Sequence, residues 1–460
     1  MLTADQASDL FSRLLRYSQA DETELLIAGG RSALTRFANN SITQNVAEEN
    51  YILSLRLNFG GRTARATTNR FDDASIRRLV ESASSLARVQ HPDPDLLPLA
   101  DQSAFAADAA SPQRAFEQTA SITAEDRARG VEQIVQAAAR HQLTAAGIYS
   151  CSESMEAVLN SRRLAAFHTQ TSAEVSITML GKDSSGWQKA NSPNVRDLDP
   201  LRLAEIAADK AMQSAAPREL PPGKYTVILE PAAVLDLAGF MFWDWGGQAV
   251  LDERSFLNNR IGEQLFGANI NIADDVYHPL QAGAPFDGEG VRRQRVQLVE
   301  NGVVRRLVYA RGTAEKMRQS PWAAKVGPIT PTGHGFPLPN EMGEAPLNIV
   351  FAVNGATRTP AEMIAGAARA ILVTRLWYIR EVDPYEKILT GMTRDGTFLI
   401  EDGKIRGGLR NFRFNQSLIE MLRNVEELSQ PVRASGEESF DMVVPAMKVR
   451  DFNFTEVTRF

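Results

Sequence analysis

The chain has 460 residues, more than one ordinary hydrophobic core holds, so we expect two or three domains. Its composition, 43% hydrophobic and 23% charged, is typical of a soluble globular protein. With 50 Lys and Arg against 56 Asp and Glu, the net charge of −6 gives no electrostatic basis for binding nucleic acid. The single cysteine, Cys151, excludes an intramolecular disulfide, and its place in an alternating strand pattern predicts a small core residue.

The first residues, MLTADQASDLFSRLLRYSQ, have the pattern of an amphipathic helix, with acidic residues early and arginines late. They do not place a basic segment before an apolar one, as a signal peptide does. The most apolar stretch of the chain, residues 230–256, is interrupted by Asp236 and Asp244, so we expect no membrane span. We therefore predict a cytoplasmic protein that binds neither membranes nor nucleic acid.

The next elements form a first unit. Segments 21–30, 32–50 and 50–69 alternate apolar and polar residues, and with the turn at Gly60-Gly61 they predict antiparallel strands. Residues 71–90 open with an Asp cap and then place apolar side chains at helical spacing. A connector rich in Pro, Asp, Ala and Ser follows.

A second unit repeats this order. Residues 123–142 predict a helix, residues 145–191 predict strands with a Gly turn, and residues 197–216 predict a closing helix. The two units are offset by about 120 residues, which indicates an internal duplication.

The second half of the chain is predicted to be rich in β-structure. After the Pro-rich linker 217–223, residues 224–231 read as a buried strand, and short strands with Gly turns predominate from residue 265. One helix is predicted over residues 359–370, with Thr359 as cap and Pro360 at its first position.

We therefore expect an α+β fold, in which a duplicated antiparallel strand-and-helix region is followed by a β-rich C-terminal domain. The predicted divisions are an N-terminal domain, a connector, a central domain related to the first, and the C-terminal domain, over residues 1–90, 91–122, 123–216 and 223–460.

The stretch EPAAVLDLAGFMFWDWGGQAVLDERSF, residues 230–256, concentrates aromatic residues. Pro231 is expected to set the first turn of a helix and Gly246-Gly247 to end it. Apolar side chains on more than one face predict a helix that is enclosed on most sides, in part by a partner subunit. Among its aromatics, Phe240, Trp243 and Trp245 are candidates for binding a peptide or a partner.

The polar residues offer few candidates for chemistry. The histidines are too far apart in sequence for two of them to converge from one helix, as metal sites usually require; they are His91, His141, His168, His278 and His334. The weak metal candidates are Asp274, Asp275 and His278, although paired aspartates more often cap backbone N–H groups.

The loop TPTGHGFP, residues 330–337, is a second weak candidate. Its glycines would let backbone N–H groups approach a peptide beside Thr332 and His334. The alternative is a mobile surface turn.

Several segments, in the same order, resemble the TldD/PmbA family. They are SFLNNRIGEQLFGANINIADD (255–275), PFDGEGVRRQRVQLVENGVVRRLVYARGTAEKM (285–317), PTGHGFP, GATRTPAEMI (355–364) and FLIEDGKI (398–405). The resemblance implies a metallopeptidase-related protein. In the catalytic branch of that family, a His-Glu-x-x-x-His helix and a cysteine near the C-terminus hold zinc. A sister subunit, PmbA or TldE, lacks these ligands and closes a chamber for unfolded peptides with it.

The same resemblance places the family's two histidines near Ala238 and Trp243 and its glutamate near Gly239. This chain has no histidine between His168 and His278 and no cysteine after Cys151. We therefore predict that it has no catalytic residues of the family type and binds no zinc itself. Zinc is expected on a catalytic partner.

The leading hypothesis is a PmbA/TldE-like, non-catalytic subunit that docks a TldD-type catalytic subunit and receives unfolded or extended peptides. A homodimer is a further option when that partner is absent. The second hypothesis is a self-sufficient hydrolase with a rebuilt site, for which the candidates are Asp236, Asp244, Asp274, Asp275 and His278. The third is a stand-alone peptide-binding scaffold.

Overall fold

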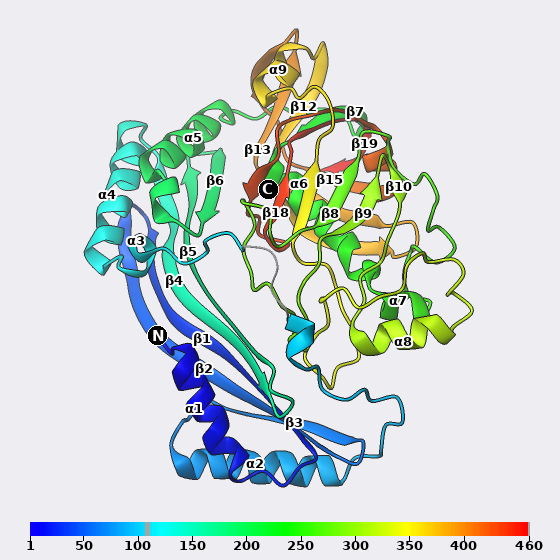
Figure 1. Cartoon of the computed structure of the whole chain (residues 1–460). Coiled ribbons are helices and arrows are strands. Elements are labelled where there is room, and N and C mark those ends of the chain that lie inside the picture. Colours follow the sequence, from blue (N-terminus) through cyan, green and yellow to red (C-terminus); the bar gives the residue numbers. More distant parts are fainter. Residues whose placement is uncertain (106–110, 459–460) are drawn as a thin grey trace.

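A computed structural model describes residues 1–105 and 111–458 of the chain. It has two lobes: a long curved sheet with helices on its outer side, and a larger lobe of shorter strands (Figure 1). Part of the predicted connector, residues 106–110, lies outside the described residues. The arrangement is the predicted α+β fold, in which a strand-and-helix N-terminal region precedes a β-rich C-terminal region.

The N-terminal lobe contains one antiparallel sheet with the strand order β3-β2-β1-β4-β5-β6. Its strands are β1 (Glu22–Ala38), β2 (Ser41–Phe59), β3 (Arg62–Thr68), β4 (Thr144–Asn160), β5 (Ala165–Leu180) and β6 (Ser185–Ser192). Pairing of β1 with β4 joins the two predicted units edge to edge. The first strands of the units begin at Glu22 and Thr144, an offset that agrees with the predicted duplication.

The sequence pattern predicted that the first strand ends at Gly30, and this prediction is wrong. Strand β1 runs on through Gly29 and Gly30, and the chain reverses at Asn39-Asn40 instead. Both asparagines adopt positive φ, 52° and 60°, which matches the twist of a tight hairpin. The Asn-Asn pair was therefore the turn signal, and the two glycines lie inside the strand.

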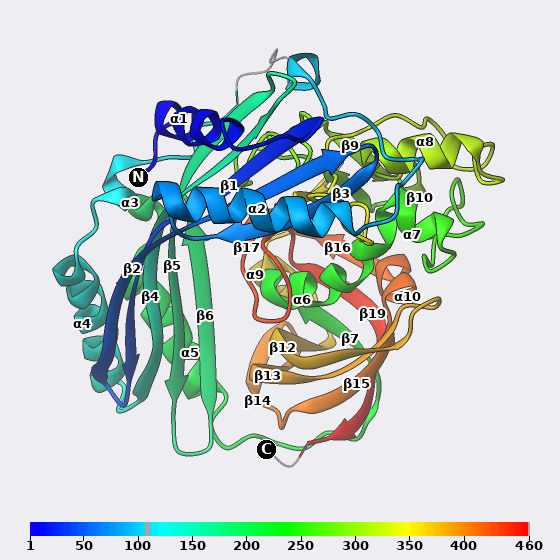
Figure 2. The ribbon, with the colours of Figure 1, turned by 90° about the horizontal axis from the view of Figure 1, so that it is seen from below.

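Helices cover the outer side of this sheet in two pairs, one over each unit (Figures 1 and 2). They are α1 (Ala4–Leu15) and α2 (Asp73–Arg88), then α4 (Ala124–Arg140) and α5 (Pro200–Gln213). Each pair buries one apolar stripe: Leu14 and Ile76 lie in the core of the first unit, and Ile134 and Ala207 in that of the second. Short helices η1 (Gln102–Phe105), α3 (Glu117–Ala120) and η2 (Val195–Asp197) lie in the connecting segments.

The C-terminal lobe contains two sheets. In one, β12, β7, β19, β15 and β13 pair in a closed ring, with β14 and β16 attached; the other has the order β10-β9-β8-β11-β18-β17. The bounds of the first are β7 (Gly223–Leu229), β12 (Arg369–Asp383), β13 (Ile388–Glu401), β14 (Lys404–Gly408), β15 (Phe412–Ser417), β16 (Val425–Leu428) and β19 (Met447–Val457). Those of the second are β8 (Asn271–Asp274), β9 (Val296–Glu300), β10 (Val303–Val304), β11 (Ile349–Ala352), β17 (Val432–Ala434) and β18 (Met442–Val444).

The helices of this lobe differ from the prediction in two ways. The helix predicted over residues 359–370 is α9 (Pro360–Ala365), which ends at Gly366, because the β-branched run that follows belongs to β12. The sequence pattern did not indicate α8 (Arg311–Gln319) or α10 (Leu418–Arg423). The remaining helical segments are α6 (Pro231–Phe242), η3 (Trp243–Trp245) and α7 (Gly247–Leu251).

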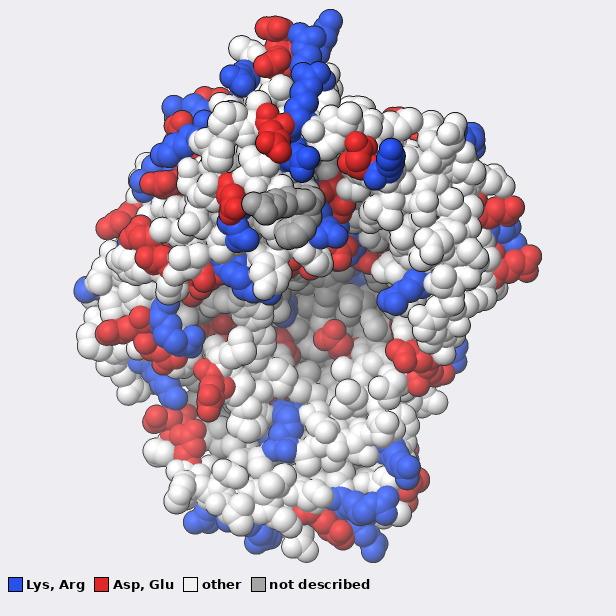
Figure 3. Space-filling model, turned by 180° about the vertical axis from the view of Figure 1, so that it is seen from behind, with Lys and Arg blue, Asp and Glu red and all other residues white. Residues whose placement is uncertain are grey.

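Acidic and basic side chains are interspersed on the face of the molecule shown in Figure 3, which is hollowed near its middle. Such mixing matches the small net charge and differs from the extended basic patch of a nucleic-acid-binding face. Within the described ranges, no helix has both the length and the apolar character of a membrane span.

Arg114 joins the two lobes. Its guanidinium donates to the carbonyl oxygens of Pro279 (3.0 Å), Val276 (3.0 Å) and His278 (2.9 Å), and its own carbonyl accepts from the Thr171 amide of β5 (2.9 Å). The residue is 5% exposed. One buried residue therefore links the lobes: its side chain holds a C-terminal loop, and its backbone carbonyl is bonded to the N-terminal sheet.

We predict that Arg114→Ala lowers the free energy of unfolding by about 3 kcal/mol, because three carbonyl groups lose a charged donor in a buried place. Urea denaturation would measure the loss. The matched control is Arg129→Ala, whose side chain is 58% exposed and pairs at the surface, with an expected change below about 0.5 kcal/mol. Equal losses in the two variants would contradict the role given to Arg114.

Candidate functional site

Helix α6 lies between the two sheets of the C-terminal lobe, in contact with β7 and β12 on one side and with β17 and β18 on the other. Pro231 occupies its first turn, as predicted. Nine of its 12 residues are buried, so the prediction of a helix enclosed on most sides is confirmed. The chain then continues as η3 and, after an extended Gly246, as α7.

The three aromatic candidates of this stretch have different surroundings. Phe240 packs partly buried against the main core, and Trp245 is fully buried between Phe242 and Phe256. Trp243 is 46% exposed, and its ring stacks on that of Phe336 at a centroid distance of 6.3 Å. Only Trp243 of the three presents a large surface to solvent.

A loop near the C-terminus, residues 435–441, lies across α6 and is called the 435–441 loop below. A Cβ atom at Gly239 would lie 1.7 Å from Ser439 Oγ and 2.5 Å from Ser439 Cβ. Ser439 therefore occupies the space into which any longer side chain at position 239 would extend.

Asp236 attaches the same loop to α6. Its Oδ1 accepts from the Glu437 and Glu438 amides at 3.2 and 3.0 Å, and its Oδ2 has no hydrogen-bond partner within the described ranges. Burial raises the pKa of Asp236 to about 7, against the two amide hydrogen bonds that favour the charged form.

The loop also contacts two other elements. Glu438 accepts from the Tyr378 amide (2.8 Å) and the Ile379 amide (3.3 Å) of β12. From β6 in the other lobe, Lys189 Nζ donates to the Gly436 carbonyl at 3.0 Å. The 435–441 loop thus joins α6, β12 and the N-terminal sheet at one place.

Thr332 and His334 are both buried, at 0% and 1% exposure. His334 Nε2 lies 2.9 Å from Asp274 Oδ1, and His334 Nδ1 lies 3.0 Å from Thr332 Oγ1. Asp274 Oδ2 also accepts from the Asn348 amide at 2.8 Å. Burial opposes the charge on Asp274, but His334 and these hydrogen bonds lower its pKa overall. The residues thus form a closed internal network, and in this conformation they do not reach a peptide at the surface.

Two buried carboxylates beside this loop were not identified from the sequence. Asp287 Oδ2 accepts from the Gly335 amide at 2.7 Å, and Glu344 Oε2 accepts from the Ala310 amide at 2.9 Å. Burial is the main cause that raises the pKa of each to about 7, and for Asp287 the neighbouring Glu289 adds to it. The carboxylates hold backbone turns together; in the sequence, Asp287 resembled an ordinary turn residue.

The three weak metal candidates do not form one site. Asp275 and His278 line a cavity of about 350 Å³ beside β8, β11 and β18, whereas Asp274 is bonded to His334. His278 Nδ1 accepts from the Leu280 amide (3.2 Å), and burial lowers the pKa of His278. The described part of the chain contains no group of three or more His, Cys, Asp or Glu placed to hold a metal ion.

The candidates for a rebuilt hydrolytic site do not share partners either. Asp244 forms an ion pair with Lys387, which also binds Glu381 at 2.7 Å. Asp236 faces the 435–441 loop. Asp275 faces Arg295, with 3.5 Å between Oδ2 and Nε. These contacts give each carboxylate a local structural role.

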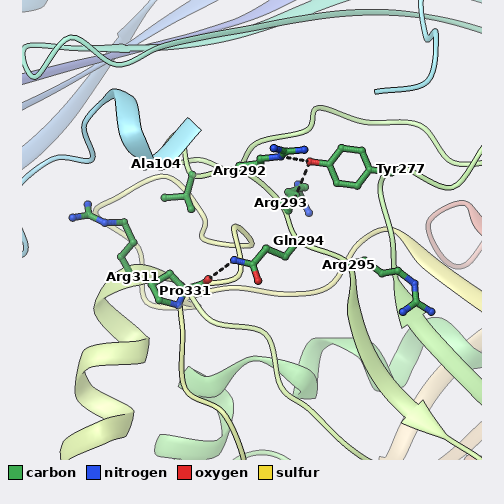
Figure 4. A pocket seen from close by; sticks show the side chains of 9 residues that line it. Ala104, Tyr277, Arg292, Arg293, Gln294, Arg295, Arg311 and Pro331 are labelled. Carbon is green, nitrogen blue, oxygen red and sulfur yellow. Dashed lines mark hydrogen bonds between the residues drawn. The ribbon is translucent and has the colours of Figure 1, made fainter. Parts of the chain in front are cut away.

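A further pocket of about 620 Å³ lies between η1 and the loops of the C-terminal lobe (Figure 4). Arg292 Nε donates to Tyr277 Oη at 3.1 Å, and Gln294 Nε2 donates to the Pro331 carbonyl at 3.1 Å. Arg311, also on the wall, pairs with Glu289 at 3.5 Å. Arg292, Gln294 and Arg311, which line this pocket, are thus engaged in contacts within the chain.

Comparison with known proteins gives the family. The model of the PmbA/TldA metallopeptidase C-terminal domain matches residues 222–456, just over half of the chain, and that of the PmbA/TldA metallopeptidase domain 1 matches residues 23–87. The chain therefore belongs to the TldD/PmbA family.

Curated relatives span nearly the whole chain. Metalloprotease PmbA of Escherichia coli O157:H7 is 21% identical over 94% of this chain and 95% of its own length. The metalloprotease PmbA homolog of Haemophilus influenzae is 22% identical, covering 95% of this chain and 96% of its own length.

Solved structures show the same fold. TldE from Thermococcus kodakarensis superposes with a TM-score of 0.82 at 19% identity, over 98% of this chain and all of that one. A structure from Thermotoga maritima gives a TM-score of 0.83 at 18% identity, with the same coverage.

The residues of α6 and of η3 directly after it do not fit the zinc site that the family resemblance implies. Ala238, Gly239 and Trp243 provide no imidazole or carboxylate, and the space beside Gly239 is filled by Ser439.

The Gly239–Ser439 contact yields a direct test of this packing. We predict that Gly239→Ala lowers the free energy of unfolding by about 2 kcal/mol through overpacking. In a Ser439→Gly background the same change becomes neutral or stabilising by up to about 1 kcal/mol, because Ala is the better helix former. Urea denaturation of the two single variants and the double variant measures the coupling, and additive effects would contradict the contact.

Asp236 is predicted to make stability depend on pH. Its folded pKa of about 7 exceeds the ordinary value of 3.8, so its stabilising contribution is full below pH 3.8 and is lost as the pH rises through 7. The slope is at most about 1.4 kcal/mol per pH unit. Asp236→Asn removes it, so the variant should gain about 2 kcal/mol relative to the parent between pH 5 and 7.

Urea denaturation at pH 5, 6 and 7 measures this difference. The control Asp402→Asn changes a side chain that is 85% exposed, and its stability should run parallel to that of the parent. If Asp236→Asn also ran parallel, Asp236 would be ionised throughout this range.

Proposed function

We propose that this chain is the non-catalytic, PmbA/TldE-like subunit of a TldD-type zinc metallopeptidase complex. In that complex the partner carries the zinc and cleaves unfolded or extended peptides, while this chain closes the chamber and contributes binding surface. The observation that carries the proposal is the packing of α6. Where the family's motif helix would present two histidines and a glutamate, this chain has Ala238, Gly239 and Trp243, with Ser439 against the glycine.

The names of the relatives support the proposal in part. One solved relative is called TldE and the curated relatives are called PmbA, the two names of the sister subunit in the resemblance given above. The curated names also include the word metalloprotease, which we assign to the complex and not to this chain. Hydrolysis of the family type would need a zinc-activated water at this place, and Ala238, Gly239 and Trp243 supply no ligand for the metal.

A peptide-binding role is supported by the outer part of β12. This strand pairs with β7 only through Ile371–Val373, so its next residues have backbone groups that β7 does not engage. Glu438 now accepts from the Tyr378 and Ile379 amides there. These consecutive amides point to one side because β12 bulges at Tyr378, where its register with β13 breaks, and we propose that a carboxylate or carbonyl group of a peptide accepts from them in place of Glu438. Trp243 of η3 is the exposed aromatic directly after α6, and we propose that Phe240, Trp245, Thr332 and His334 support this surface from within.

The proposal predicts a complex with a defined metal content. Co-expression with a TldD-type protein from the same genome should give a stable heteromeric complex with one zinc per catalytic partner and activity on an unfolded peptide. This chain alone should hold less than about one tenth of an equivalent of zinc and show no activity, because it lacks the ligand set. Metal analysis and a peptide-cleavage assay on the purified species measure both.

Two controls separate the subunits. A partner variant without its motif glutamate should keep the complex and lose activity. Asp275→Ala in this chain should change neither zinc content nor activity. Failure of two folded proteins to associate would overturn the proposal, and so would stoichiometric zinc with activity in this chain alone.

A further inference from the structure

Two consecutive backbone amides of β12 hold a carboxylate. The Tyr378 and Ile379 amides donate to Glu438, one to each carboxylate oxygen, at 2.8 and 3.3 Å. Tyr378 has a positive φ of 56°, and the register of β12 with β13 shifts between Trp377 and Arg380. In a regular strand successive amides point to opposite edges, whereas this bulge turns both to one side. The two amides form a small anion-binding concavity, called the β12 nest below.

The present occupant of the β12 nest is a side chain that can leave it. Glu438 is partly exposed, and it belongs to the 435–441 loop beside α6 (Figure 2). The backbone of that loop is held elsewhere: Asp236 Oδ1 accepts from two of its amides, and Lys189 Nζ donates to its Gly436 carbonyl at 3.0 Å. None of these contacts uses the Glu438 carboxylate. Rotation of one side chain therefore empties the nest while the loop backbone stays in place.

The surroundings of the β12 nest are positively charged apart from Glu438. Three guanidinium groups lie within 6 Å of the ring centroids of Trp377 and Tyr378; they belong to Arg375, Arg380 and Arg394. Asp395 pairs with the first and the last of them, whereas Arg380 has no ion-pair partner within the described ranges. A carboxylate bound by the two amides gains from this excess of positive charge, and a neutral carbonyl group does not.

The two aromatic side chains beside the nest leave apolar surface open to solvent. Trp377 is 36% exposed and Tyr378 is 54% exposed. Large rings of this kind bind an apolar side chain that arrives together with the carboxylate. Because the 435–441 loop stays across α6, a peptide reaches the amides from the solvent side and ends there. This direction of approach favours a chain end over a segment that continues past the nest.

We propose that the β12 nest binds the C-terminal carboxylate of a peptide whose last side chain is apolar and packs on Trp377 and Tyr378. Glu438 is the internal competitor that fills the nest until such a chain end replaces it. Backbone nests are a recurring means of capturing a chain terminus. The inference rests on the peptide-binding role in the proposed function, and it adds the class of peptide and the group that regulates its binding.

The first experiment measures binding to the full-length chain by fluorescence anisotropy. The probe is an N-terminally labelled peptide, Gly-Ser-Gly-Ala-Leu, as the free acid and as the C-terminal amide. Glu438→Ala should bind the acid at least 10-fold more tightly than the parent does, because the nest is no longer filled from within. The same variant should bind the amide at least 10-fold more weakly than the acid, since the amide brings no charge.

Two controls accompany this measurement. Glu437→Ala removes the neighbouring carboxylate, which lies 3.6 Å from Lys189 Nζ, and should bind the acid as the parent does. The amidated peptide Gly-Glu-Gly-Ala-Leu has a side-chain carboxylate only and should bind weakly, which separates the two sources of carboxylate. Circular dichroism would check that both variants are folded. The parent gives the comparison of acid with amide without any substitution, and it too should prefer the acid.

The second experiment locates the site by hydrogen exchange of a peptic fragment that covers residues 374–382. In Glu438→Ala the Tyr378 and Ile379 amides lose their acceptor, so they should exchange at least 10-fold faster than in the parent. A saturating amount of the free-acid peptide should restore slow exchange, and the amidated form should not. Exchange that the acid leaves unchanged would overturn the assignment of the site.

Three binding results would also overturn the inference: equal affinity for acid and amide, no gain in affinity from Glu438→Ala, or tight binding of the peptide with only a side-chain carboxylate. A complex with a TldD-type partner that still formed and cleaved peptides would then leave the proposed function standing. Conversely, capture of the free acid by a chain that forms no such complex would support the nest and overturn the proposed function.

Discussion

The contact between Gly239 and Ser439 determines which side chains α6 can carry at its middle. Because a Cβ at 239 would lie 1.7 Å from Ser439 Oγ, the helix and the 435–441 loop approach each other more closely than a side chain at position 239 would allow while Ser439 is present. The Asp236 carboxylate fixes the loop from the same helix, and Glu438 extends the connection to β12. A surface on which the family resemblance would place a metal-binding helix is thus closed by the chain's own backbone and side chains.

The duplication explains the shape of the other lobe and also its asymmetry. Two units with the same order of helices and strands join through β1 and β4, which gives one sheet with two equivalent edges. The two edges meet the C-terminal lobe differently: beside β5, Arg114 and Gln170 provide the contacts, whereas from β3 the Arg65 Nε donates to the Leu338 carbonyl at 2.7 Å. A repeated unit inside a single chain cannot have both copies in the same surroundings, so the difference between the edges follows from the attachment of one further lobe.

Periodicity predicted the elements that have strong local signals. The helices that begin behind Asp72, Thr123 and Asp199 follow from their caps and apolar spacing, and the α+β class follows from their order. Pairing between β1 and β4 was not predictable, since it joins residues more than 100 positions apart and has no local signal. Helix α8 was missed because its sequence is polar and its only buried residues are Thr313, Ala314 and Met317.

The sequence showed which metal ligands the candidate site lacks, but it did not show which side chains fill the space there. The absence of histidine between His168 and His278 is visible in the sequence. The contact of Ser439 with Gly239 is not, because it joins two segments 200 residues apart. Likewise, His334 resembled a loop histidine near a ligand, but its neighbours Asp274 and Thr332 make it part of the interior. A buried carboxylate such as Asp236 costs stability when charged, and its Oδ2 has no hydrogen-bond partner within the described ranges, while its Oδ1 holds the 435–441 loop. The 435–441 loop contacts α6, β12 and, through Lys189, the N-terminal sheet, so Asp236 ties the helix to both lobes through this one segment.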